Sequence, residues 1–239
     1  MSYATHSFDA VRLLRDGVTI ATGRAAIEEA ARQLLGGAVV AIPTDTVYGL
    51  AAAIDSPSAL AAIFAIKGRE RAQTLPVLVT DPAAASLLLR PTSLERGTAS
   101  DRLLALADRF WPGGLTVALP ARPDLPADVV AADGTVGVRV PDHDVARALL
   151  RLAGGALAVT SANRSGQPPL IDAAAVQREL GEKGLLWVLD GGPSGLVIAS
   201  TVIGQANGKL VIHREGAIAG DILGQCWAAL NAAAGQRPG

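Results

Sequence analysis

The stretch ALAVTSANRSG, residues 156–166, joins a run of apolar residues to a loop of hydrogen-bonding side chains. Residues 156–160 have the composition of a strand buried inside a sheet, which is typical of sheets covered by helices. The loop that follows carries Ser161, Asn163, Arg164 and Ser165. Such a loop is either an ordinary polar turn or one wall of a binding site, and the loop alone does not decide between the two.

The same pattern of short apolar strands and amphipathic helices extends over the chain. Strands are expected at 38–42, 75–79, 115–119, 135–140 and 156–160, and helices at 23–35, 56–66, 101–110, 143–152 and 172–180. Strands near 185–189, 200–203 and 209–213 follow without helices between them, before a closing helix from about Gly220. The alternation predicts an α/β fold, a twisted mixed sheet with helices on its faces. We expect an N-terminal extension over 1–22 and one domain over 23–239.

Composition restricts the classes of function. The 239 residues carry a formal net charge of −1, so any anion must be held by a local cluster of cations. The single cysteine, Cys226, excludes an internal disulfide and a cysteine-rich zinc site, and its helical pattern predicts a packed thiol. No apolar run reaches the ~20 residues of a membrane-spanning helix, and the N-terminus has no signal-peptide core. A soluble, cytoplasmic protein without membrane contact is expected.

Polar side chains gather where the predicted strands end, which is where α/β sheets bind ligands. Hydroxyls, an amide and cations recur there, while histidine, cysteine and catalytic carboxylates are nearly absent. Arginine forks and lysine charges suit phosphate and carboxylate groups, so this inventory predicts a polyanion site. Each residue also has a simpler interpretation: Lys67 and Arg69 complement a helix C-terminus, Thr44 caps a turn, and Arg139 faces solvent from an alternating strand. Neither a P-loop nor a dinucleotide fingerprint occurs.

Six segments together resemble the YrdC/Sua5 family, the L-threonylcarbamoyladenylate synthases. They are PTDTVYGL (43–50), IKGRERAQTLPVLV (66–79), FWPGGLTVAL (110–119), VGVRVPDH (136–143), VTSANRSGQPP (159–169) and STVI (200–203). The resemblance covers roughly residues 25–216 and is that of a short form without the C-terminal Sua5 domain. Thr74 departs from it, because many members have Asn, Asp or His there, and Gly114 stands where proline is usual.

The resemblance implies a YrdC/RibB-like fold with a concave anion-binding surface and an ATP-dependent reaction. L-threonine, bicarbonate (or CO2) and ATP would give threonylcarbamoyl-AMP and pyrophosphate. A downstream tRNA threonylcarbamoyl transferase complex would use the product to form N6-threonylcarbamoyladenosine at position 37 of tRNA. Mg²⁺ would arrive with ATP, held mostly by phosphate and water rather than by a metal site of the protein.

The resemblance also assigns roles to residues. It implies catalytic roles for Lys67, Arg69, Ser161 and Asn163. L-threonine would contact Thr44, Thr74, Arg139 and Ser161. ATP would contact Lys67, Arg69, Thr116, Asn163, Ser200 and Arg214.

Two other classes of function share this fold. One is a module that binds double-stranded RNA or ribosome precursors, against which the balanced charge and the 3% aromatic content argue. The other is a carbamoyltransferase that acts on a different small acceptor.

Overall fold

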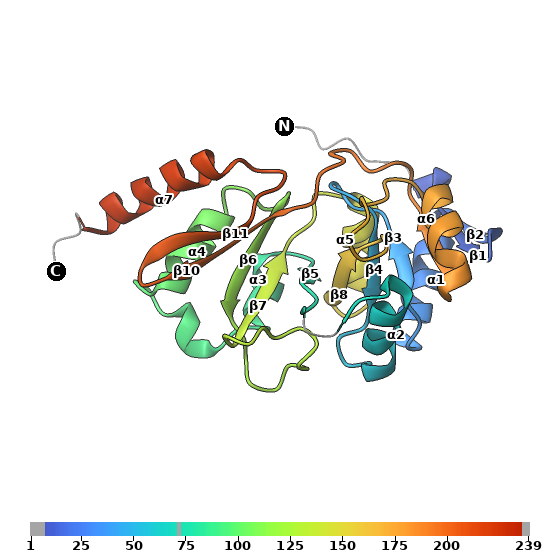
Figure 1. Ribbon diagram of the computed structural model, residues 1–239, viewed down its shortest axis with the longest axis horizontal. Coiled ribbons are helices and arrows are strands. Elements are labelled where there is room, and N and C mark those ends of the chain that lie inside the picture. Colours follow the sequence, from blue (N-terminus) through green and yellow to red (C-terminus); the bar gives the residue numbers. More distant parts are fainter. Residues whose placement is uncertain (1–7, 71–72, 236–239) are drawn as a thin grey trace.

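The computed structural model describes residues 8–70 and 73–235, and its centre is a mixed sheet flanked by helices (Figure 1). The sheet has eleven strands in the order β11-β10-β6-β7-β5-β8-β4-β3-β9-β1-β2. Their bounds are β1 Arg12–Arg15, β2 Val18–Thr22, β3 Val40–Ile42, β4 Gly49–Ala52, β5 Val77–Val79, β6 Leu115–Pro120, β7 Thr135–Arg139, β8 Ala156–Ser161, β9 Trp187–Asp190, β10 Thr201–Ala206 and β11 Lys209–Arg214.

Parallel and antiparallel pairs alternate irregularly through this sheet. The pairs β10–β6, β5–β7 and β3–β9 are parallel, and the other neighbours are antiparallel. Two strands from late in the chain lie between early ones: β8 pairs with both β4 and β5, and β9 pairs with both β3 and β1. The mixed sheet predicted from the sequence is therefore confirmed.

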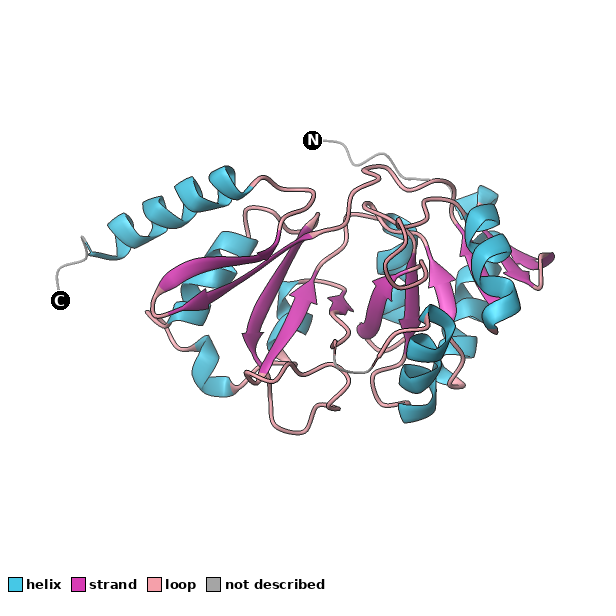
Figure 2. Cartoon of the chain, viewed as in Figure 1, coloured by secondary structure: helices cyan, strands magenta, loops and turns pink. Residues whose placement is uncertain are grey.

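Helices pack on both faces of the part of the sheet around β3 and on one face of the part around β6 and β7 (Figure 2). They are α1 Gly23–Leu35, α2 Pro57–Lys67, α3 Pro82–Ser86, α4 Ala99–Ala107, α5 Asp144–Leu152, α6 Ala173–Leu180 and α7 Gly220–Gly235, with 3-10 turns at Phe8–Ala10, Pro91–Leu94 and Gly181–Lys183. The predicted start of α2 is confirmed, since the Ser56 hydroxyl accepts a hydrogen bond from the Ala59 N–H. No helix within the described ranges is long and apolar enough to cross a membrane.

Alternating side chains in the central strands separate two hydrophobic clusters. In β3, Val40 and Ile42 pack with α1 and α5, whereas Ala41 between them belongs to the cluster that includes residues of α2 and α6. Successive side chains of a strand point to opposite faces, so both faces of this half of the sheet are covered by helices. In α7, Leu223 and Trp227 are buried and Cys226 packs beside them, as its helical pattern predicted.

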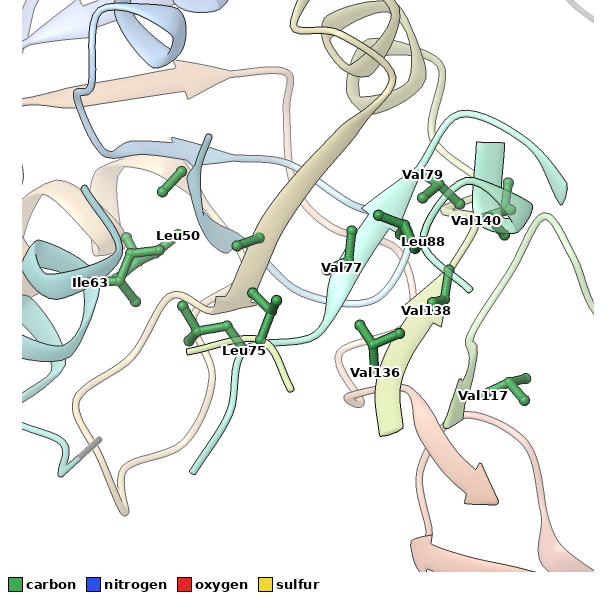
Figure 3. Packing of buried hydrophobic residues seen from close by; sticks show 14 of the residues in the cluster. Leu50, Ile63, Leu75, Val77, Val79, Leu88, Val117, Val136, Val138 and Val140 are labelled. Carbon is green, nitrogen blue, oxygen red and sulfur yellow. The ribbon is translucent and has the colours of Figure 1, made fainter. Parts of the chain in front are cut away.

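The other half of the sheet places its apolar residues on one face. Figure 3 shows side chains from β5, β6 and β7 gathered together, among them Val77, Val79, Val117, Val136 and Val138. In β6 and β7 the residues that alternate with them are small or polar: Thr116 and Ala118 in β6, and Gly137 and Arg139 in β7. In β5 the alternating residue is Leu78, which is buried in the other cluster. The second face of β6 and β7 therefore lacks the large side chains of a core, and it forms the floor of the site described below.

Three strands differ from the sequence-based expectation. β4 lies inside the segment read as a loop, because its residues, Gly49 to Ala52, include the poor strand formers glycine and alanine. Residues 12–22, read as an N-terminal extension, form β1 and β2, and Leu13 is fully buried where β1 joins β9. Residues 1–7 of that extension lie outside the described part of the chain, and the division at residue 22 stays a prediction.

Candidate active site

A cavity of about 420 Å³ lies on the polar face of β6 and β7 and extends to the residues that end β8 and precede β4. Its lining brings together eight of the residues predicted from the sequence: Thr44, Arg69, Thr74, Thr116, Arg139, Ser161, Ser200 and Arg214. Three of these are arginines, Arg69, Arg139 and Arg214, which come from segments at least 70 residues apart in the sequence. The lining includes a single carboxylate, Asp133, so the cavity is suited to anions.

Arg139, Thr46 and Thr44 form one hydrogen-bonded group in the cavity wall, which we call the Arg139 end. Arg139 is buried, with 5% of its surface exposed, rather than solvent-facing as its alternating strand alone would suggest. Its Nη2 pairs with Asp45 Oδ1 at 2.5 Å, its Nη1 donates to Thr46 Oγ1 at 2.9 Å and its Nε donates to the Gly113 carbonyl at 2.8 Å. Burial lowers the pKa of Arg139, and the charge of Asp45 opposes that shift.

The Thr44 hydroxyl serves the turn at residues 44–47 as well as the cavity. It donates to the Val47 carbonyl at 2.6 Å and lies within hydrogen-bonding distance of the Thr46 and Val47 N–H groups, at 3.2 and 3.3 Å. The turn-capping interpretation of Thr44 is therefore correct, and it coexists with a place in the cavity wall. Because the Thr44 hydroxyl already donates within the turn, it could contact a ligand only as a hydrogen-bond acceptor unless the turn changes.

Arg214, Ser200 and Thr116 form a second hydrogen-bonded group in the wall, which we call, together with the nearby Arg69, the Arg69–Arg214 end. Arg214 Nη2 donates to the Ser200 carbonyl at 2.8 Å, and the hydroxyls of Ser200 and Thr116 are 2.8 Å apart. Partial burial and the nearby charge of Arg214 lower the pKa of Arg69. Neither arginine has an ion-pair partner among residues 8–70 and 73–235, so this end carries uncompensated positive charge.

Gly216 allows the segment after β11 to lie against this end. A Cβ at residue 216 would lie 2.2 Å from the Ala199 carbonyl oxygen and 2.6 Å from the Ser200 carbonyl carbon. Both are backbone atoms, which cannot move aside as the tip of a long side chain can. The neighbouring Ala217 N–H donates to that same Ala199 carbonyl at 2.9 Å. Glycine is thus required where this segment approaches the residues that hold Ser200.

Lys67 and Asn163 do not line the cavity but lie behind its wall. Lys67 is 3% exposed, and its Nζ donates to the carbonyls of Ser161 and Asn163 and to Asn163 Oδ1. Burial, followed by the charge of Arg69, lowers the pKa of Lys67 to about 8. The structure thus uses Lys67 to connect the end of α2 to the loop after β8, whose Ser161 faces the cavity. Arg164 is exposed, as expected from the sequence.

Several lining residues were not predicted. Thr46 and Tyr48 lie within the PTDTVYGL segment, and the Tyr48 hydroxyl donates to the Gly192 carbonyl at 2.7 Å. Both residues follow the strand predicted at 38–42, and this position could have marked them as candidate site residues. Asp133 comes from the turn before β7, Thr135 begins β7 and His213 lies in β11, and no local pattern in the sequence marks them.

A family model described as "Telomere recombination", which covers Sua5, YciO and YrdC, matches residues 32–216. The chain belongs to the YrdC/Sua5 family. Its fold agrees with that of a solved member, the crystal structure of Pyrococcus abyssi Sua5 complexed with L-threonine (TM-score 0.78, 31% identity). That match covers 86% of this chain and 58% of the other. Escherichia coli YciO has the same fold at 23% identity, with a TM-score of 0.69.

Curated members of the family carry the name of one enzyme. The threonylcarbamoyl-AMP synthase of Bacillus subtilis (strain 168) is 38% identical over 200 residues, which are 83% of this chain and 56% of that protein. The threonylcarbamoyl-AMP synthase of Alkalilimnicola ehrlichii is 35% identical over 196 residues, 82% of this chain and 98% of that protein. The chain thus spans little more than half of some relatives and nearly all of others. These relatives confirm the family and the enzyme class predicted from the sequence.

Proposed function

We propose that this chain is a threonylcarbamoyl-AMP synthase, which condenses L-threonine, bicarbonate (or CO2) and ATP to threonylcarbamoyl-AMP and pyrophosphate. One observation carries the proposal: a hydroxyl-lined cavity with a buried, fixed arginine at one end and, at the other, two arginines without an acidic partner among the described residues. A small amino acid matches the Arg139 end, and a nucleotide triphosphate matches the Arg69–Arg214 end.

The Arg139 end suits the α-carboxylate of threonine. Arginine binds carboxylates through paired, charge-assisted hydrogen bonds, and Arg139 presents its guanidinium to the cavity in one orientation. Thr46 and Ser161 bring hydroxyls to the same region, where they can hold the polar groups of the amino acid. Thr74 also lines the cavity, so its expected contact with threonine stays a proposal.

The reaction needs alignment and charge neutralisation more than covalent help from the protein. Threonine and CO2 form a carbamate, N-carboxy-threonine, whose carboxylate oxygen attacks the α-phosphorus of ATP. A new oxygen–phosphorus bond forms as the bond to pyrophosphate breaks. Two anionic groups must approach each other, and Arg69 and Arg214 reduce their repulsion while the fixed hydroxyls orient them.

Lys67 and Asn163 have an indirect part in this proposal. Because Lys67 Nζ is bonded to the backbone of the Ser161–Asn163 loop, it supports the position of Ser161. The expectation that Lys67 and Asn163 contact ATP directly requires these bonds to rearrange when ATP binds. Arg69, two residues after Lys67, faces the cavity without any rearrangement.

A Mg²⁺ ion would travel with the triphosphate. Residues 8–70 and 73–235 contain no group of three or more histidine, cysteine, aspartate or glutamate side chains able to hold a metal. Asp133 Oδ1 already accepts hydrogen bonds from the Thr135 N–H and hydroxyl, at 3.0 and 2.7 Å. The protein's own residues therefore do not fit a resident metal site, and no step is assigned to the ion.

The test is a reconstitution with purified protein, L-threonine, bicarbonate, Mg²⁺ and ATP. Pyrophosphate should form only when threonine is present, and mass spectrometry should detect threonylcarbamoyl-AMP. Pyrophosphate release that ignores threonine would overturn the proposal. Transfer of the product to tRNA position 37 would need the downstream transferase, which the same assay can include as a second stage.

A further inference from the structure

We propose that Asp45 is a positioning residue, which fixes the Arg139 guanidinium so that it receives the carboxylate of L-threonine in one orientation. The proposal rests on the proposed function, because it concerns how the same site selects its amino acid. Asp45 does not line the cavity and touches no reacting group, so it acts only through Arg139.

The geometry of the pair supports this role. The side chains of Arg139 and Asp45 are 6% and 11% exposed, and their Nη2 and Oδ1 atoms are 2.5 Å apart. A guanidinium has five N–H groups. Asp45, Thr46 and the Gly113 carbonyl take one each, and the other two, one on each Nη atom, have no acceptor within the described residues. Two free N–H groups match the two oxygens of a carboxylate.

Asp45 is itself held from several directions. Its Oδ1 accepts from the Asp142 N–H at 3.1 Å, and its backbone carbonyl accepts from the Leu196 N–H at 3.0 Å. These contacts come from the residues after β7 and from the loop that leads to Ser200. A carboxylate anchored in this way gives Arg139 a fixed partner rather than a mobile one.

Stability alone does not account for this buried pair. Well-packed apolar side chains are often as stabilising as a buried ion pair, or more so, because both charges must leave water. Asp45 Oδ2 is buried and has no hydrogen-bond partner among the described residues, which adds to the cost. The pair therefore contributes little to stability compared with apolar side chains, but it holds the Arg139 guanidinium at the cavity wall in one orientation.

Asp45 also changes how the Arg139 end attracts an anion. The carboxylate of Asp45 offsets the positive charge of Arg139, whereas Arg69 and Arg214 have no such partner in the described ranges. Threonine is then held at Arg139 by the placement of hydrogen bonds more than by net charge. Losing Asp45 should damage threonine binding selectively and leave ATP binding nearly intact.

The experiment measures pyrophosphate formation by the full chain while threonine and ATP are varied in turn. In Asp45→Asn, which keeps the shape but removes the charge, we expect the KM for threonine to rise about tenfold or more. The KM for ATP should stay within about twofold and kcat within about threefold. Asp142→Asn is the matched control, because it removes a nearby exposed charge but keeps the N–H bonded to Asp45, and it should resemble the wild type.

A second measurement separates positioning from a general loss of structure. L-threoninol has a hydroxymethyl group in place of the carboxylate, so its inhibition constant should differ by less than about twofold between wild type and Asp45→Asn. Equal weakening of threonine and threoninol would overturn the proposal, and so would an unchanged KM for threonine. A wild-type protein without threonine-dependent pyrophosphate would instead overturn the proposed function.

Asp45→Glu decides the matter if the Asn variant does not fold, as judged by circular dichroism. It keeps the charge but lengthens the side chain by one methylene. The Arg139 guanidinium is then displaced, but Arg139 keeps an acidic partner. We expect the KM for threonine to rise about three- to fivefold, with the KM for ATP unchanged. Wild-type values for both substrates in this variant would contradict the proposal.

Discussion

The two ends of the cavity hold their arginines in opposite settings. At the Arg139 end, the guanidinium is buried and bonded to a carboxylate, a hydroxyl and a carbonyl. At the Arg69–Arg214 end, Arg69 is half-buried, Arg214 is exposed, and neither has an acidic partner among the described residues. The first end therefore offers a fixed hydrogen-bond geometry, and the second offers unneutralised charge.

This difference suits the two proposed ligands. Several amino acids resemble threonine and carry the same carboxylate. Recognition of threonine therefore depends on where the hydrogen-bonding groups of the site are placed. A triphosphate carries several negative charges, and a cationic surface without acidic partners among the described residues can neutralise them. Mutations at the two ends should therefore differ in their effect on stability, on each KM and on the response to salt.

The largest expected effect is on stability at the Arg139 end. Arg139→Met removes one partner of a buried pair and leaves Asp45 charged and uncompensated. The free energy of unfolding should fall by about 3–5 kcal/mol, measured by urea denaturation. Arg164→Met, at an exposed arginine of the loop after β8, should change it by less than about 0.5 kcal/mol. If the free energy of unfolding fell by similar amounts in both variants, the distinction between a buried, paired arginine and a solvent-exposed one would be contradicted.

The next effect concerns Lys67, the buried cation behind the wall. Its pKa is lowered from 10.5 to about 8 in the folded state, mainly by burial. Above about pH 8 the folded protein releases this proton while the unfolded chain keeps it, so unfolding takes up a proton and this group makes stability rise with pH. Urea denaturation at steps between about pH 7.5 and 9.5 should show that rise in wild type, relative to Lys67→Met. Parallel curves for the two proteins would mean that Lys67 is not desolvated.

Gly216 tests the other end specifically. In Gly216→Ala the added Cβ would strike the backbone at Ala199 and Ser200, so the segment that carries Arg214 must shift. The KM for ATP should rise on the order of tenfold, because displacement of binding groups is costly in a preformed site. The KM for threonine should stay near the wild-type value. Gly224→Ala, where a Cβ meets nothing within 4 Å, is the matched control. If the KM for threonine rose as much as the KM for ATP, the two ends would not act as separate binding regions.

The smallest effect is the response to salt. Raising ionic strength from about 0.05 to about 0.5 M should increase the KM for ATP about two- to threefold, because exposed charges are screened. The KM for threonine should barely change, since Arg139 is buried and already paired. Arg69→Gln should reduce the salt response of ATP. A threonine KM that responds to salt as strongly as the ATP KM would contradict the geometric account of the Arg139 end.

Much of this arrangement could be predicted from the sequence, because strand exits in an α/β sheet carry the site. Residues that follow predicted strands, such as Ser161, line the cavity. Features that tertiary contacts decide could not be predicted. The role of Lys67 as a phosphate ligand stays a prediction, whereas its burial against two backbone carbonyls depends on where β8 lies beside β4. The pairing of Asp45 with Arg139 joins residues 94 positions apart, which no local pattern marks.

The place of β8 between β4 and β5 has a consequence for how the chain acquires its structure. During synthesis, both neighbours exist long before β8 emerges, so the early half carries open strand edges that invite wrong pairing. Pairings this distant in sequence make folding slow. The loop with Ser161 follows β8 directly, so the strand that closes those edges also delivers a wall of the cavity. We therefore expect the sheet to close and the site to form together, and chains truncated before β8 to be aggregation-prone and inactive.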